Sequence, residues 1–312
     1  MKEFAPNYYT SFSCIADRCR HSCCVGWEID IDEDSLEYYR SIAGEFGKRL
    51  RDHIEETEDG AHFCLDADER CPFLNDCGLC DLYATLGEEA LCQICTDHPR
   101  FRNEFSCRTE IGVGLCCEAA AKLILEQSEP LSLVSLYDDG EEAEDEEWEA
   151  VLFAKREQIF ATLYSAESEK AAADQICPKG SAFMKSQDWA SILMELERLD
   201  PAWEEPIGWL ENAPQSVWER EIPHLDRAFR NLFGYFIYRH ASGAQSLFDM
   251  EIRLGFAYLS LGVLRALCAM KMQRQGECTL LDLCELARMY SSEIEYSIDN
   301  TDALMMLWEE NA

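Results

Sequence analysis

Residues 248–274, FDMEIRLGFAYLSLGVLRALCAMKMQR, repeat apolar side chains at three- and four-residue spacing. This period is that of an α-helix with a buried face. The most apolar part, residues 256–270, is shorter than the roughly 20 residues needed to cross a bilayer, and it contains Arg265. The stretch therefore predicts a helix in a globular bundle, and we expect no membrane partner.

The same period recurs in four other stretches, at residues 149–166, 189–199, 223–240 and 279–307. Asp188, Pro223 and Thr279 stand where helices begin, and Gly180 and Gly276 stand where helices end. Since no alternating strand pattern interrupts these stretches, the second half of the chain predicts a helical bundle.

The first half differs in composition. Of the 17 cysteines in the 312-residue chain, 13 lie between Cys14 and Cys117, among frequent Gly, Pro and Asp, with one expected helix at residues 34–53. Loops that hold a metal have this character, because ligand geometry replaces part of the packing. We therefore expect a mainly α protein, in which an irregular cysteine-rich metal-binding N-terminal region is followed by a helical bundle.

A run of acidic residues separates the two halves. Nine of the twelve residues at 138–149 are Asp or Glu, which is typical of a solvated linker or a helix start. The expected division is a cysteine-rich metal or iron-sulfur region at 1–130, an acidic linker at 131–149 and a helical domain at 150–312.

The formal charge of −34 argues against nucleic acid as a partner, because so acidic a surface repels phosphate backbones. The N-terminal sequence MKEFAPNYYTSFSC has no apolar run of signal-peptide length, so we expect a cytoplasmic protein. In that reducing compartment, clustered thiols favour metal ligation or redox chemistry over structural disulfides.

The cysteines form four groups that leave three interpretations open. The groups are Cys14, Cys19, Cys23 and Cys24; Cys71, Cys77 and Cys80; Cys92 and Cys95; and Cys107, Cys116 and Cys117. The pairs Cys77/Cys80 and Cys92/Cys95 are spaced as in a four-thiolate zinc site. Soft thiolates suit an iron-sulfur centre as well, and either pair alone has the spacing of a redox dithiol.

Several common motifs are absent from the sequence. A radical S-adenosylmethionine site needs a cysteine at position 26, where Gly26 stands. The sequence has no glycine-rich dinucleotide loop, no P-loop and no HExxH zinc motif. The sequence therefore contains no glycine-rich loop that would identify a cosubstrate.

Several segments together resemble the flagellin lysine N-methylase family, part of a wider group of cysteine-rich zinc- or iron-chelating domains. The segments are Phe12-Ser13-Cys14, Cys23-Cys24-Val25-Gly26-Trp27, Cys71-Pro72-Phe73-Leu74, Leu79-Cys80, Leu86-Gly87-Glu88, Cys95 with Pro99-Arg100, Cys116 with Glu118-Ala119-Ala120, and residues 290–297. The chain departs from the family pattern at His98, Cys117 and Tyr296, and Cys77 and Cys92 are additional cysteines.

The resemblance implies transfer of methyl groups from S-adenosylmethionine to lysines of a protein substrate such as flagellin. It also implies a [4Fe-4S] cluster, with zinc as the alternative, and eight candidate ligands: Cys14, Cys19, Cys23, Cys24, Cys71, Cys80, Cys95 and Cys116. By their place in the C-terminal match, Glu295, Tyr290 and Tyr296 are the candidate catalytic residues. Trp27 is the candidate to shield a cluster or to stack on adenine.

The surplus thiols and the missing cosubstrate loop leave a second hypothesis open. In it the protein is a non-enzymatic zinc- or iron-binding adaptor or metal-handling protein, whose acidic surface binds a basic partner.

Overall fold

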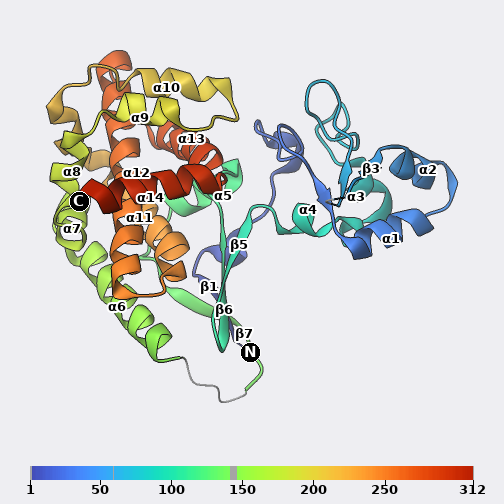
Figure 1. The fold of residues 1–312 in the computed structure, drawn as a ribbon, viewed down its shortest axis with the longest axis horizontal. Coiled ribbons are helices and arrows are strands. Elements are labelled where there is room, and N and C mark those ends of the chain that lie inside the picture. Colours follow the sequence, from blue (N-terminus) through green and yellow to red (C-terminus); the bar gives the residue numbers. More distant parts are fainter. Residues whose placement is uncertain (1, 59, 141–145, 312) are drawn as a thin grey trace. The chain divides into compact units, whose positions relative to one another are not determined.

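The fold is taken from a computed structural model, which describes residues 2–58, 60–140 and 146–311. The chain forms two compact units (Figure 1): unit 1 comprises residues 1–12 and 101–312, and unit 2 comprises residues 13–100. The predicted mainly helical class is confirmed. These boundaries differ from the expected division at 130 and 150, because residues 101–138 pair and pack with the N-terminal strand and the C-terminal helices.

Unit 1 is built around one long helix. Its helices are α5 (Glu118–Leu125), α6 (Glu147–Ser165), α7 (Glu169–Ile176), α8 (Gly180–Ser186), α9 (Trp189–Glu195), α10 (Glu204–Gly208), α11 (Asp226–His240), α12 (Leu247–Gln275), α13 (Leu280–Tyr290) and α14 (Ile298–Asn311). Helix α12 contacts α8, α11, α13 and α14, and residues 255–269 are buried on every side of it.

Helix α12 is longer than its apolar core suggested. With 29 residues it is long and apolar enough to cross a membrane by length and composition alone. However, 83% of its most apolar 18-residue window is buried inside the molecule. Such burial is typical of the core helix of a soluble protein.

A four-stranded sheet joins the strand at residues 2–6 to three strands from residues 100–138. Its order is β5 (Arg100–Glu104), β6 (Arg108–Val113), β1 (Lys2–Pro6) and β7 (Leu133–Asp138). Strand β1 is parallel to β6 and antiparallel to β7, with Phe4 opposite Glu110 and Ser135. Strand β7 thus occupies part of the expected acidic linker, and residues 141–145 of that linker lie outside the described residues.

The end of the acidic run starts helix α6. Glu146 and Glu149 form a reciprocal capping box, in which each side chain accepts a hydrogen bond from the other's backbone amide. The Glu149 carboxylate also accepts the Ser106 amide at 2.8 Å. Acidic side chains are favourable at a helix N-terminus because they face its partial positive charge.

Two stretches expected as single helices are divided. Residues 34–53 form α1 (Glu33–Ser41) and α2 (Gly44–Asp52), because the backbone is extended at Ile42 and Ala43 and Gly44 starts α2 with a positive φ of 82°. Residues 279–307 form α13 and α14 with a π-helix, Ser291–Glu295, between them. Ser297 then accepts the Asn300 amide at 3.3 Å and so starts α14.

Unit 2 has its own small core. Its remaining elements are α3 (Asp81–Leu86), α4 (Gln93–Asp97) and a three-stranded sheet of order β2 (Asp30–Ile31), β4 (Ala61–Phe63) and β3 (Ile54–Glu56). Tyr39, Phe63 and Phe73 are buried together, with Phe63 and Phe73 ring centroids 5.1 Å apart. The Tyr39 hydroxyl donates to the Ala90 carbonyl at 2.8 Å and ties helix α1 to the later loops.

We expect Gly255→Ala to destabilise unit 1 by about 2–3 kcal/mol, because a Cβ atom there would overlap the buried Trp308 indole. Gly262→Ala is the matched control in the same helix. Its Cβ would come closest to the terminal methyl group of Met184, which can shift more readily than an indole ring, so the gain in helix propensity offsets more of the cost. Urea unfolding measures both values, and equal effects would contradict this account of the α12–α14 contact.

Candidate functional site

The π-helix Ser291–Glu295 directs Glu295 into a buried polar cluster at the C-terminal end of α11. Its carboxylate side chain has no exposed surface. Single π-turns are rare and often mark functional sites, because they re-aim side chains that a regular helix would direct elsewhere.

Three side chains of α11 surround the Glu295 carboxylate. His240 Nε2 lies 2.6 Å from Glu295 Oε1, and Arg239 Nε lies 3.4 Å from the same oxygen. The Tyr235 hydroxyl donates to the carboxylate at 3.1–3.2 Å and accepts from Arg239 Nη1 at 2.8 Å. The Leu115 amide also donates to this hydroxyl at 3.2 Å. The buried carboxylate thus has polar partners in Tyr235, Arg239 and His240.

The charges of this cluster are set by competition between burial and pairing. Burial acts to raise the pKa of Glu295, but the Arg239 charge and the His240 hydrogen bond outweigh it and hold that pKa below its usual value. Burial lowers the pKa of His240 despite its hydrogen bond to Glu295. The cluster therefore holds an ionised carboxylate, a guanidinium and a neutral imidazole whose Nε2–H donates to Glu295.

Tyr296 forms the exposed side of the cluster, with 44% of its surface accessible. The Arg239 guanidinium lies over the Tyr296 ring and over the Phe101 ring, 5.0 Å from each centroid. The Tyr296 hydroxyl is hydrogen-bonded to the Cys116 thiol, and burial raises the pKa of that thiol to about 12. Burial, followed by the Cys116 charge, raises the pKa of Tyr296, so its phenol stays protonated.

Tyr290 is not part of this exposed side. Its ring is fully buried against Phe236 and Trp203, and its hydroxyl donates to Ser260 Oγ at 2.8 Å. The structure thus brings Glu295 and Tyr296 to one cluster and places Tyr290 in the hydrophobic core.

The sequence did not identify Tyr235, Arg239 and His240 as site residues. All three lie within the stretch expected as a helix at 223–240, but their spacing puts them among apolar residues that look like ordinary core. Arg239 and His240, two adjacent basic residues at the end of an apolar helix, were the available signal, although the helix dipole explains such residues as well.

In unit 2, five thiols from three of the four cysteine groups affect one another electrostatically: those of Cys24, Cys71, Cys80, Cys92 and Cys95. The Cys71 amide donates to the Cys24 carbonyl at 2.8 Å, so these two positions are adjacent. The Cys92 and Cys95 sulfurs are 3.4 Å apart. Four of the five belong to the predicted ligand set, and Cys92 joins them although it is an additional cysteine.

The thiols are close but do not form a closed site. Among the described residues, no three His, Cys, Asp or Glu side chains form a group able to hold a metal ion as they stand. A hydrogen bond with Cys23 lowers the pKa of Cys24 to about 7, whereas burial raises the pKa of Cys71 to about 12. Since mutual repulsion of thiolates opposes ionisation of Cys71, a cation that accepts several thiolates would relieve it.

The other predicted residues lie elsewhere. Cys14 and Cys23 are exposed in unit 2, and the Cys19 thiol contacts the His21 carbonyl at 3.4 Å. Cys116 belongs to unit 1. The Trp27 indole donates to the Cys23 carbonyl at 2.7 Å and lies 6.0 Å from the His98 ring, so it packs beside the cysteine loop.

We expect Glu295→Gln to cost about 3 kcal/mol of folding free energy at neutral pH, because it leaves the Arg239 charge buried without its counter-charge. Glu56→Gln, which removes the partner of Arg40 at a place where both side chains are about half exposed, should cost under about 1 kcal/mol. Because folding lowers the pKa of Glu295, the gap between wild type and Glu295→Gln should narrow as pH falls through that pKa. Denaturant unfolding at several pH values tests this, and a gap independent of pH would refute it.

No protein-family model matches the chain, and no solved structure matches it. The chain is 28% identical over 142 residues to the lysine-N-methylase of Salmonella typhimurium (strain LT2), covering 43% of this chain and 35% of that protein. The lysine-N-methylase of Salmonella choleraesuis matches to the same extent. The flagellar biosynthetic protein FliU of Salmonella muenchen is 28% identical over 147 residues, which cover 43% of this chain and 84% of that protein. The match thus spans about a third of the length of the two lysine-N-methylases.

Proposed function

We propose that this protein is a cytoplasmic, S-adenosylmethionine-dependent protein lysine N-methyltransferase that contains a cysteine-ligated iron-sulfur cluster and acts on a flagellin-type substrate. The observation that carries the proposal is the similarity to proteins named lysine-N-methylase and flagellar biosynthetic protein FliU. The converging thiols of unit 2 and the buried Glu295 cluster of unit 1 support it independently.

The reaction is an in-line displacement, in which the neutral lysine amine attacks the methyl carbon of the sulfonium. Lysine must first lose its proton, and its unperturbed pKa is about 10.4. An apolar, aromatic surface helps because it disfavours the charged ammonium. Tyr296 and Phe101 supply aromatic surface beside the cluster, and the Tyr296 ring is accessible from solvent.

In this proposal Glu295 is a positioning residue. Its lowered pKa makes it a weak base, and its oxygens already accept from Tyr235 and pair with Arg239 and His240. Its carboxylate holds the His240 imidazole through Nε2 and holds the Arg239 guanidinium against the face of the Tyr296 ring. Tyr296 is the residue that meets the incoming lysine, and its protonated phenol orients the amine by hydrogen bonding.

The thiols of Cys24, Cys71, Cys80, Cys92 and Cys95 would hold the metal centre, which requires four of them for one cubane. The all-sulfur donor set from separate segments fits an iron-sulfur cluster or zinc. Because methyl transfer moves no electrons, the group when bound supplies cross-linking of unit 2 rather than redox chemistry. Trp27, which packs beside the first cysteine loop, would shield it from solvent.

Oxygen-protected protein should contain iron and acid-labile sulfide and should be brown. Cys71→Ser should lose most of the iron and lower the thermal midpoint of unfolding, since ligation stabilises the fold. Cys77→Ser is the matched control, because Cys77 is exposed and lies outside the five-thiol group. Stoichiometric zinc without sulfide would reject the cluster, and equal iron in both variants would reject this ligand assignment.

Methyl transfer should be detectable with isotope-labelled S-adenosylmethionine and flagellin. Tyr296→Phe should lower kcat/KM by roughly tenfold, because it removes one orienting hydrogen bond at the exposed side of the cluster. Tyr137→Phe is the control, since that tyrosine is also exposed but lies on strand β7, outside the cluster. Absence of both transfer and S-adenosylmethionine binding would reject the activity.

One observation favours a non-enzymatic metal-binding protein instead. The matched region spans only about a third of the lysine-N-methylases, so the segment they share need not carry their whole activity. Iron or zinc bound at the five-thiol group, together with no calorimetric signal for S-adenosylmethionine, would favour this alternative.

A further inference from the structure

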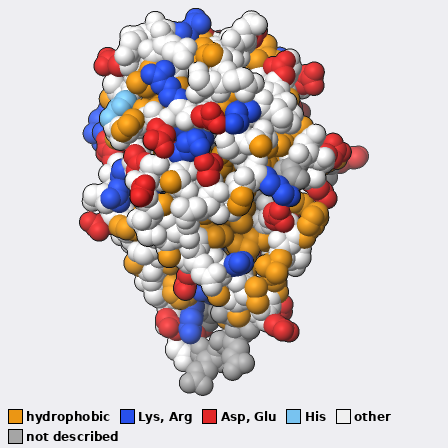
Figure 2. Space-filling model, turned by 90° about the vertical axis from the view of Figure 1, so that its left-hand side faces the viewer, with side chains coloured by type: hydrophobic (Ala, Val, Ile, Leu, Met, Phe, Trp, Pro, Cys, Tyr) orange, Lys and Arg blue, Asp and Glu red, His pale blue; other side chains and the backbone are white. Residues whose placement is uncertain are grey.

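A cavity of about 510 Å³ opens on the face of unit 1 formed by α6, α7, the first half of α12 and the end of α14. Figure 2 shows this face, where hydrophobic side chains surround a hollow and isolated Lys or Arg side chains lie around it. The volume is in the range of small-molecule sites, about 300–1,000 Å³. None of its lining residues belongs to the Glu295 cluster.

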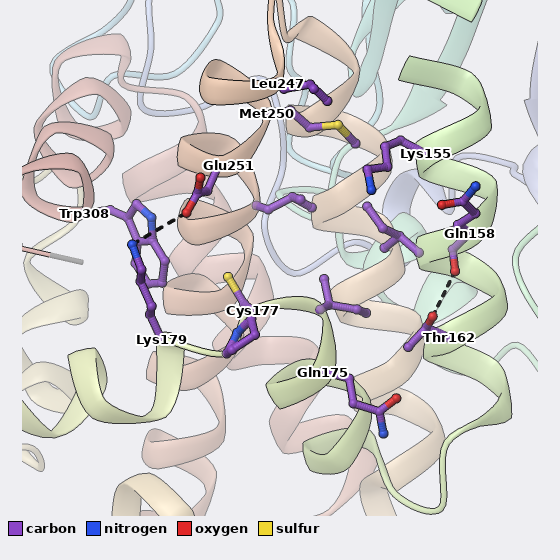
Figure 3. Close-up of a pocket in the computed structure, with 14 residues that line it drawn as sticks. Lys155, Gln158, Thr162, Gln175, Cys177, Lys179, Leu247, Met250, Glu251 and Trp308 are labelled. Atoms are coloured by element: carbon purple, nitrogen blue, oxygen red, sulfur yellow. Dashed lines mark hydrogen bonds and ion pairs between the residues drawn. The ribbon is translucent and has the colours of Figure 1, made fainter. Parts of the chain in front are cut away.

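Apolar side chains form the interior of the cavity: those of Ile159, Ile176, Met250, Leu254 and Trp308, with Leu247 at the exposed end. Figure 3 shows Met250 and Leu247 at one end and Trp308 on the side opposite α6. Such a lining favours an aliphatic or aromatic body over a strongly hydrated ligand.

Lys155 supplies an unmatched positive charge. It lines the cavity from α6, and Figure 3 shows its amino group pointing inward. Among the described residues Lys155 has no ion-pair partner, although acidic residues outnumber basic ones 61 to 27 in the chain. Lys155 is exposed at the rim of the cavity, so its ammonium can reach an anionic group whose apolar part lies inside.

The other charged groups in the lining compensate each other. Lys179 Nζ lies 3.7 Å from Glu251 Oε1 beside Trp308. The lining therefore carries one net positive charge, from Lys155, while the whole chain carries −34. Cys177 lies near this pair, but burial raises the pKa of its thiol to about 12, so it is not a nucleophile at neutral pH.

We propose that this cavity binds a small amphipathic carboxylate, with its apolar body among Ile159, Met250 and Leu254 and its carboxylate on Lys155. The apolar interior and the single unmatched cation together select this class. A ligand without an apolar body would not fill the cavity, and one without a negative charge would not engage Lys155. The site is separate from the proposed methyl-transfer residues and does not depend on that proposed function.

Isothermal titration of the full chain with octanoate tests the proposal. Octanoate should give saturable binding at one site, whereas 1-octanol should bind several-fold more weakly and acetate should not bind. Lys155→Met should weaken octanoate binding about tenfold, as expected for loss of a charge-assisted hydrogen bond. Leu247→Asp, at a position 56% exposed, should weaken it at least as much because it places a like charge at the cavity.

Two matched variants control for general effects. Lys122→Met removes a lysine of α5 that pairs with Glu126 outside the cavity, and Leu281→Asp changes a leucine of α13 that is 65% exposed. Both should bind octanoate as wild type does. The proposal is overturned if octanoate does not bind, or if all four variants behave alike. It is also overturned if S-adenosylmethionine displaces octanoate and loses affinity in Lys155→Met, since the cavity would then belong to the cosubstrate.

Discussion

The burial of α12 on all sides is the constraint on which unit 1 depends. Residues 255–269 of this helix are buried without interruption, so no side of it can face water. Helices α8, α11, α13 and α14 must therefore all contact it, and Gly255 lets the Trp308 ring approach its backbone closely. The position of α11, and hence of the residues around Glu295, follows from this packing.

Several arginines buried in unit 1 are paired with buried carboxylates. Arg265 in the middle of α12 lies 3.1 Å from Glu169, and Arg156 lies 2.7 Å from Glu110. Arg239 and Glu295 follow the same pattern, but they lie next to an exposed tyrosine and include a histidine. The first two pairs tie α7 to α12 and α6 to the sheet, whereas the third adjoins the exposed Tyr296 ring, where the proposed methyl transfer would take place.

The helical period at 248–274 and 149–166 predicted α12 and α6 well, because long amphipathic or apolar helices are determined by local pattern. The break at 291–297 was not predictable, since it depends on tertiary hydrogen bonds: Glu293 accepts the amides of Leu199 and Asp200 at 2.8 and 2.9 Å. Strand β7 was missed for a similar reason, because its partner β1 is far away in sequence. At the candidate site, the family resemblance predicted Glu295 and Tyr296. Tyr235, Arg239 and His240 could be identified only from the folded structure, which brings α11 against the π-helix.

The position of β1 inside its sheet also determines when the protein can finish folding. Strand β1 is synthesised before its neighbours β6 and β7, which follow more than 100 and 125 residues later. All of unit 2 is made in the interval, as the crossover that a parallel pair requires. Residues 2–6 must therefore remain available until β6 and β7 have been made, and deleting them would remove an interior strand of the sheet.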